Sequence, residues 1–149
     1  MENKNELMEK NTGELDINTV NNLKRFTTVN LESEEGKAKI YNSLQRCDVR
    51  LIDIKGQDIE IEDIYIEGKT KDEEDEKTGE VKTVTKYRTI LYGTNGMTYV
   101  STAYGIFNSI AQIIRLFGYP TPEKPYKLRV SGRTNKNGTE SLILTYIHE

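Results

Sequence analysis

The segment QDIEIEDIYIEGKTK, residues 57–71, alternates apolar and polar side chains, and the alternation changes phase in its middle. The parity changes between two pairs of isoleucines: Ile59 and Ile61, then Ile64 and Ile66. Because successive side chains of a β-strand point to opposite faces of a sheet, one extra residue near Glu62 and Asp63 would restore a single apolar face. An extra residue of this kind is a β-bulge, which bends its strand. The segment therefore predicts one long, bent strand that can serve two parts of a sheet.

Further segments after this strand predict four more strands and one helix. In chain order they are VKTVTKYRTILY (81–92), MTYVS (97–101), a helix capped by Ser101 or Thr102 and closed by Gly118, YKLRVSG (126–132) and SLILTYI (141–147). Runs rich in Thr, Val, Tyr and Ile favour strands, and Asn-Gly turn signals lie between the strands of each pair. Four isoleucines and Phe117 recur at helical spacing in the segment between the pairs.

Two different segments precede this series. Residues 1–30 are rich in Asn, Glu and Lys, which is typical of a mobile tail, with short helical content expected near Val20–Phe26. SEEGKAKIYNSLQ then predicts a helix, because Ser33 can cap it and Glu34 and Glu35 suit the positive end of its dipole.

Five short strands with a helix between the third and the fourth are typical of the OB-fold, a five-stranded Greek-key barrel. We therefore predict a mainly β chain with a mobile tail over residues 1–30, an N-terminal helix, and a single OB-fold domain over residues 31–149. Residues 68–80 are predicted to be an acidic loop between the first two strands of the barrel. A length of 149 residues suits one such domain.

The sequence offers few groups for catalysis. Cys47 is the only cysteine and His148, next to the C-terminus, is the only histidine, which excludes an internal disulfide and a Cys/His metal cluster. No GxxxxGK[ST] phosphate loop is present. We expect no enzymatic activity, no metal site and no cofactor. The chain also lacks an apolar run long enough to span a membrane, so the cytoplasm is the default compartment.

Charge is distributed unevenly along the chain, whose formal net charge is −3. Residues 1–80 hold 12 Lys and Arg against 21 Asp and Glu, a net −9, whereas residues 81–149 hold 9 against 3, a net +6. A basic segment within an acidic chain favours a polyanionic partner for that segment.

The strand over residues 81–92 combines cations with aromatic rings. Lys82, Lys86 and Arg88 share one parity with Tyr92, and this parity is predicted to face outward because burying unpaired charge is costly. Proteins that bind single-stranded nucleic acid need this combination, since cations follow the phosphates while aromatic rings stack on the bases.

Three tyrosines are candidates for base stacking: Tyr87, Tyr92 and Tyr99. The alternative for each is a packing role with only its hydroxyl in water. The fourth strand and its loop add four candidate phosphate contacts: Lys127, Arg129, Arg133 and Lys136.

The segments resemble the single-stranded DNA-binding proteins of small tailed phages of Gram-positive bacteria, the group that includes the protein-primed Bacillus phages. The matching pieces are EEGKAKIYNS, IEIEDIYIEG, the TGE of the acidic loop, GTNGMTYVSTAYGIFNSI, FGYPTPEKPYKLRV and NGTESLILT, and they cover about residues 33–147. The resemblance implies an OB-fold protein that coats and protects displaced single strands during phage DNA replication, without enzymatic activity, in the host cytoplasm. It also implies binding roles for four residues: Tyr87, Tyr92, Tyr99 and Arg88.

Two other functions stay open at the level of the sequence. A protein–protein adaptor of the same fold could use the acidic residues 71–76 to contact a basic replication protein, such as a DNA polymerase. An RNA-binding OB module would need the same cations and rings. The acidic loop is also a candidate flap over the basic groove, with a solvated hairpin loop as the plainer alternative. The sequence does not determine the oligomeric state.

Overall fold

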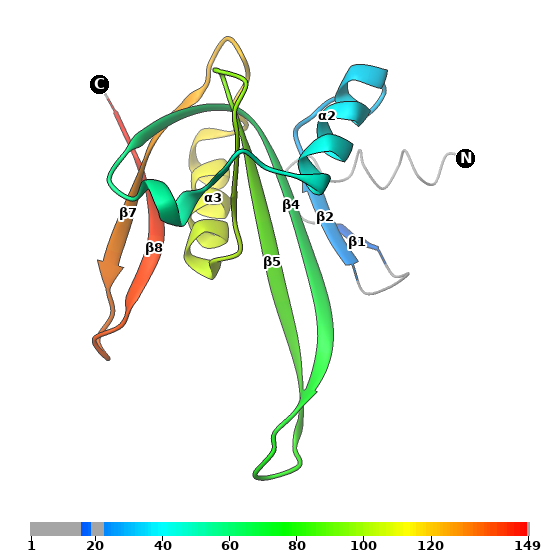
Figure 1. Ribbon diagram of the computed structural model, residues 1–149, viewed down its shortest axis with the longest axis vertical. Coiled ribbons are helices and arrows are strands. Elements are labelled where there is room, and N and C mark those ends of the chain that lie inside the picture. The colour runs from blue at the N-terminus through cyan, green and yellow to red at the C-terminus, as the bar shows by residue number, and fades with distance from the viewer. Residues whose placement is uncertain (1–15, 19–22, 149) are drawn as a thin grey trace.

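The computed structural model describes residues 16–18 and 23–148, which form one curled sheet with two helices (Figure 1). The strands are β1 (Asp16–Asn18), β2 (Leu23–Thr27), β3 (Val49–Arg50), β4 (Asp58–Glu74), β5 (Val81–Gly93), β6 (Thr98–Ser101), β7 (Tyr126–Thr134) and β8 (Glu140–Tyr146). The helices are α2 (Glu34–Gln45) and α3 (Tyr104–Phe117), and a short 3-10 helix, η2, covers Leu51–Ile54. The sheet curls into half of a barrel, and the two helices pack against it. The architecture is therefore mixed α and β, whereas the sequence predicted a mainly β barrel.

The β-bulge predicted near residues 62–63 is confirmed. β4 pairs with β5 in antiparallel register, and that register shifts between Ile61 and Asp63. On the edge opposite β5, residues 58–61 of β4 pair with β7, and residues 65–69, beyond the bulge, pair with β2. One bent strand therefore joins the two ends of the curled sheet, and Ile61 and Ile64 are both fully buried in one core.

Helix α3 lies inside the curl, between β5 and the β7–β8 hairpin (Figure 1). Of the residues at the predicted helical spacing, Ile106, Ile110 and Ile113 are buried and Ile114 is partly buried, whereas Phe117 is 53% exposed. The helix lies close to β8, since a Cβ on Gly105 would come 2.2 Å from the Leu142 carbonyl oxygen. The Leu144 N–H donates to the Ser109 hydroxyl at 3.1 Å, so a helix side chain satisfies a backbone group of β8. The predicted cap at Ser101 or Thr102 is wrong, because Ala103 holds the cap position and makes no side-chain hydrogen bond there.

Helix α2 covers the opposite face of the sheet. It begins as predicted, with the Ser33 hydroxyl accepting from the Gly36 N–H at 2.9 Å. Beneath it lies a second, smaller cluster of buried residues: Val29, Tyr65, Ile90 and Tyr92. The stretch of β5 from Thr89 to Gly93 is consequently buried on both faces.

The N-terminal prediction needs correction. The mobile tail was predicted for residues 1–30, of which residues 1–15 and 19–22 lie outside the described part of the chain. β2, at Leu23–Thr27, is a strand paired with β4, not helix or tail, and Phe26 belongs to the main core at 2% exposure. The domain boundary predicted at residue 31 therefore cuts off a strand of the sheet.

β4 and β5 continue as an arm (Figure 1), which we define as residues 67–74 and 81–88; β2 pairs with its base at residues 67–69, and beyond these residues the arm has two strands. β6 pairs with β5 only from Thr89 onward, so it leaves this stretch of the β5 edge without a partner strand within the described residues. The acidic loop predicted for residues 68–80 is shorter, because β4 runs to Glu74 and the connection covers residues 75–80 only. This connection lies at the end of the arm and not over it, which contradicts the flap hypothesis.

Candidate nucleic-acid interface

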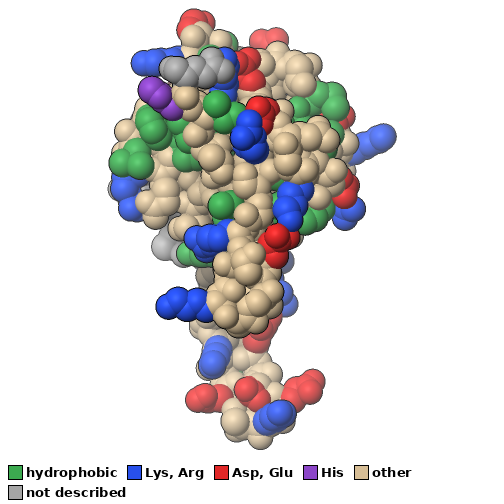
Figure 2. All heavy atoms as spheres, turned by 90° about the vertical axis from the view of Figure 1, so that its left-hand side faces the viewer, with side chains coloured by type: hydrophobic (Ala, Val, Ile, Leu, Met, Phe, Trp, Pro, Cys, Tyr) green, Lys and Arg blue, Asp and Glu red, His purple; other side chains and the backbone are tan. Residues whose placement is uncertain are grey.

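A groove follows the base of the arm, where β5 passes the N-terminal end of α3. It is lined by eight residues: Glu67, Lys69, Thr85, Lys86, Tyr87, Arg88, Thr102 and Tyr104. Three of the residues predicted from the sequence therefore meet here: Lys86, Tyr87 and Arg88. Figure 2 shows basic side chains at intervals along the arm and acidic side chains gathered at its tip.

The aromatic wall of the groove consists of Tyr87, Tyr104 and Phe107. The Tyr87 ring is stacked on Phe107, with 3.8 Å between ring centroids and 5° between planes. Tyr104 is tilted against both rings and is 65% exposed. A Cβ on Gly68 would come 2.7 Å from a Tyr87 ring carbon, so glycine at this position lets the ring lie close to β4. The wall thus contains one exposed ring, Tyr104, next to the half-buried ring of Tyr87, which Phe107 holds in place by stacking.

The cationic wall includes two lysines that face each other across the arm. Lys69 of β4 and Lys86 of β5 are direct cross-strand partners. Like charges directly opposite each other in a sheet are destabilising. The nearest carboxylate to Lys86 is that of Glu73, at 3.9 Å, and Lys69 has no ion pair with any described residue. An anion in the groove would relieve the repulsion between these two ammonium groups.

Arg88, the third cation of the groove, is already paired. Its Nη2 donates to Glu67 Oε2 at 2.6 Å, and the Tyr65 hydroxyl donates to Glu67 Oε1 at 2.9 Å. Burial, followed by the effect of the Glu67 carboxylate, raises the pKa of Tyr65 above its ordinary range, which keeps this hydroxyl available as a donor. The side chains of Arg88 and Glu67 are 35% and 24% exposed. The guanidinium is thus at the groove but engaged with an internal carboxylate.

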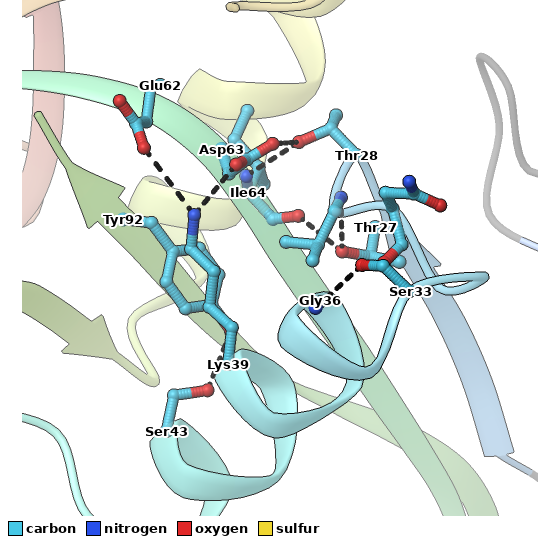
Figure 3. Close-up of polar contacts among 12 residues, drawn as sticks. Thr27, Thr28, Ser33, Gly36, Lys39, Ser43, Glu62, Asp63, Ile64 and Tyr92 are labelled. Carbon is cyan, nitrogen blue, oxygen red and sulfur yellow. Dashed lines mark hydrogen bonds and ion pairs between the residues drawn. The ribbon is translucent and has the colours of Figure 1, made fainter. Parts of the chain in front are cut away.

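Two predicted stacking residues are buried elsewhere. Tyr92 is 1% exposed: its hydroxyl lies 2.6 Å from that of Ser43 in a hydrogen bond, and Lys39 Nζ lies 5.0 Å from its ring centroid (Figure 3). Burial raises its pKa to about 12. Tyr99 is 7% exposed within the main core and accepts a hydrogen bond from Asn95. Neither ring presents a face to solvent in this structure, because α2 covers Tyr92 and the core encloses Tyr99.

The remaining predicted cations lie outside the groove. Lys82 lies farther along the arm, and four belong to β7 and its hairpin: Lys127, Arg129, Arg133 and Lys136. The Arg129 guanidinium grips Asp58 with two hydrogen bonds, Nε to Oδ1 at 2.7 Å and Nη2 to Oδ2 at 3.2 Å. This arginine lowers the pKa of the Asp58 carboxyl, so the two charges neutralise each other near neutral pH. The structure thus separates the β7 cations from the tyrosine-lined groove.

Sequence reasoning missed Tyr104 and Lys69. The helical period places Tyr104 off the face that carries the isoleucines, a signal that marks an exposed ring at the start of α3. Lys69 falls in the segment assigned to the acidic loop, although it continues the two-residue alternation of the preceding strand. Both residues follow from patterns that the sequence contains.

Among the residues that the structure describes, we find neither a cluster of metal ligands nor a helix able to span a membrane. No group of three or more His, Cys, Asp and Glu residues there is placed to hold a metal ion. No described helix combines the length and the apolar composition that crossing a bilayer requires. The groove beside β5 is the candidate functional site, because cations and aromatic rings both line it.

A family model described as phage single-stranded DNA-binding protein matches residues 19–146. No curated protein and no solved structure shows a significant match to the chain.

Proposed function

The chain belongs to the phage single-stranded DNA-binding protein family, and from this membership we propose that a single strand of DNA lies in the groove beside β5. Members of this family bind DNA rather than catalyse a reaction. The observation that carries the assignment to this groove is that the exposed Tyr104 ring and two opposed lysines, Lys69 and Lys86, line it from the two faces of the β4–β5 ladder. A nucleic-acid strand suits both features, because its phosphates attract the lysines and its bases stack on the ring.

In the proposed complex, one base stacks on Tyr104 and the neighbouring base meets the accessible part of Tyr87. The strand then passes the edge of β5, so that its adjacent phosphates lie between Lys69 and Lys86 on the other face of the ladder, where their negative charge offsets the repulsion between the two ammonium groups. Stacking on an aromatic ring tolerates any base, and phosphates are the same in every sequence, so binding has little sequence preference. Such a strand is held unpaired, which fits the coating of displaced single strands during phage replication.

We propose further that the fold is an open variant of the OB-fold. β4, β5, β6, β7 and β8 take the places of its five strands, with α3 between the third and the fourth. Pairing of β4 with both β5 and β7, and of β7 with β8, supports this interpretation. α3 lies where the third and fifth strands would close the barrel. On this interpretation one domain contains β2 as well as residues 31–149.

The cellular setting follows from the family rather than from the groove. We propose that the protein acts in the host cytoplasm, where displaced strands are produced. A replication protein such as a DNA polymerase is a candidate partner, since the strand must be handed over when it is copied.

Fluorescence anisotropy of a labelled oligo-dT tests the proposed site. Tyr104→Ala should lose about 1–3 kcal/mol of binding free energy, and the affinity of the wild-type protein should fall steeply with salt because phosphate contacts release counterions. Tyr41→Ala is the matched control, because Tyr41 is 63% exposed on α2 and lies outside the groove. Equal affinities of the Tyr104 and Tyr41 variants would contradict the proposed site.

A further inference from the structure

The pair between Arg88 and Glu67 is unusual among the arginine–carboxylate pairs that the structure describes. Arg129 and Arg50 each grip an aspartate with two hydrogen bonds, through both Nε and Nη2. Arg88 donates to Glu67 through Nη2 alone, and its Nε is buried without a hydrogen-bond partner among the described residues. A two-pronged grip is the stronger geometry for this cation, so Arg88 in the free protein holds a partner that uses only part of its donor fork.

Glu67 is also held from another side. The Tyr65 hydroxyl donates to its Oε1, and the cross-strand register places Arg25 of β2 directly beside it. The carboxylate thus keeps the hydrogen bond from Tyr65 when Arg88 leaves, and Arg25 is the nearest residue of the neighbouring strand in the register. Arg88, in contrast, would gain from a new partner. Its buried Nε makes no hydrogen bond with the described residues, which costs free energy that a new acceptor would recover.

We propose that Glu67 is an internal competitor for the DNA phosphate: its carboxylate occupies Arg88 in the free protein, and binding of a strand exchanges that carboxylate for a phosphate. The proposal rests on the proposed function, since it assumes that the strand lies in the groove that Arg88, Lys69 and Lys86 line. Arg88 then turns so that both Nε and Nη2 meet phosphate oxygens, while Glu67 stays with Tyr65 and Arg25. Glu67 in this way lowers the affinity that the cations alone would give.

If Glu67 competes with the phosphate, removing its charge should strengthen binding rather than weaken it. Glu67→Gln removes the charge but keeps the size, and it should tighten binding of oligo-dT about two- to fivefold, the range expected for releasing an ion pair of this exposure. The salt dependence of log Kd should become steeper by up to about 0.7, because one more cation is free to displace counterions from a single strand. If Glu67 instead only positions Arg88, the same variant should bind more weakly.

Glu123→Gln is the matched control, because Glu123 is exposed and changes the net charge equally. It follows the C-terminal end of α3, whereas the groove lies at the N-terminal end, and a helix of 14 residues is about 20 Å long. Comparable tightening in both variants would reveal a general charge effect and would overturn the specific role of Glu67.

A second variant at the same position separates the competitor role from a general disturbance of the fold. Glu67→Asp keeps the charge and draws the carboxylate back by one methylene, so it should tighten binding by less than Glu67→Gln and in the same direction. Weaker or unchanged binding in both variants, in protein shown to be folded by circular dichroism, would overturn the competitor role. If Tyr104→Ala still weakens binding in that case, the groove assignment stands without the exchange at Arg88.

Discussion

The β4–β5 ladder passes through two environments in one continuous register. Near the helices, Ile90, Leu91 and Tyr92 are all buried although they alternate in direction, because α2 covers one face and α3 covers the other. In the arm, Lys86 is exposed and Tyr87 only half-buried, because the helices end there. The comparison teaches that helices docked on a strand decide the role of its side chains, and that alternation alone does not.

The largest loss of stability should come from removing an aromatic ring in the part of the ladder that the helices cover. Tyr92→Ala should lower the free energy of unfolding by about 3–5 kcal/mol, as for other buried aromatic residues. Tyr87→Ala, in the arm, should cost about 1.5 kcal/mol or less, mainly from the lost stacking on Phe107. Urea unfolding followed by circular dichroism measures both, and equal losses would contradict the contrast between covered ladder and arm.

Alkaline pH should weaken the covered part of the ladder. Burial raises the pKa of Tyr92 to about 12 from its ordinary value of 10.0, so the folded protein keeps this proton when the unfolded chain loses it. The resulting stabilisation is complete below pH 10 and is lost as the pH rises toward 12, by about 3 kcal/mol in total. Urea unfolding at several pH values measures the slope.

Tyr92→Phe is the control for the alkaline loss, since it removes the ionisable hydroxyl and keeps the ring. Its stability should fall less between pH 10 and 12 than that of the wild-type protein. Burial also raises the pKa values of Tyr65 and Tyr126, so part of the slope remains in the variant. Identical slopes would exclude Tyr92 as a source of the loss.

Local features of the chain were predictable because short-range physics determines them. The phase change between Ile61 and Ile64 located the bulge, since a strand must keep one apolar face toward the core. Ser33 was identified as a cap because a hydroxyl at that position satisfies a free N–H of the first helical turn. The helical period of α3 indicated its apolar face, of which Ile106, Ile110 and Ile113 are buried although Phe117, in the same series, is exposed.

The candidate site was predictable only in part because its composition depends on long-range packing. Tyr92 shares its parity with Lys86 and Arg88, and nothing local indicates that α2 covers the strand just beyond those cations. Tyr104 opens α3, the element after β6, and only the path of the chain between β6 and α3 brings its ring against Tyr87. The cations of β7 were assigned to the same site since strand parity does not reveal that Arg129 is neutralised by Asp58.

An intermediate effect should follow from filling the space at Gly68, at the base of the arm. Gly68→Ala places a methyl group 2.7 Å from the Tyr87 ring, which must turn away from Phe107. We expect a loss of about 1 kcal/mol in stability, at the lower end of the range for overpacking, together with weaker binding of oligo-dT. In a Tyr87→Ala background the same methyl group meets no ring, so the stability loss should disappear. Additive losses would mean that Gly68 acts independently of Tyr87.

The smallest stability effect should have the opposite sign and should separate folding from binding. Lys69→Gln removes one of two like charges that face each other across the arm, so it should stabilise the fold by about 0.2–1 kcal/mol. The same change should weaken binding of oligo-dT and make its salt dependence shallower by about 0.7, since one phosphate contact is lost. Lys124→Gln alters the net charge equally in an exposed turn after α3 and should change neither quantity. A stabilised variant that binds as well as the wild-type protein would place the strand elsewhere. A variant that is both more stable and a weaker binder would show that the protein keeps a repulsive pair because the DNA phosphate resolves it.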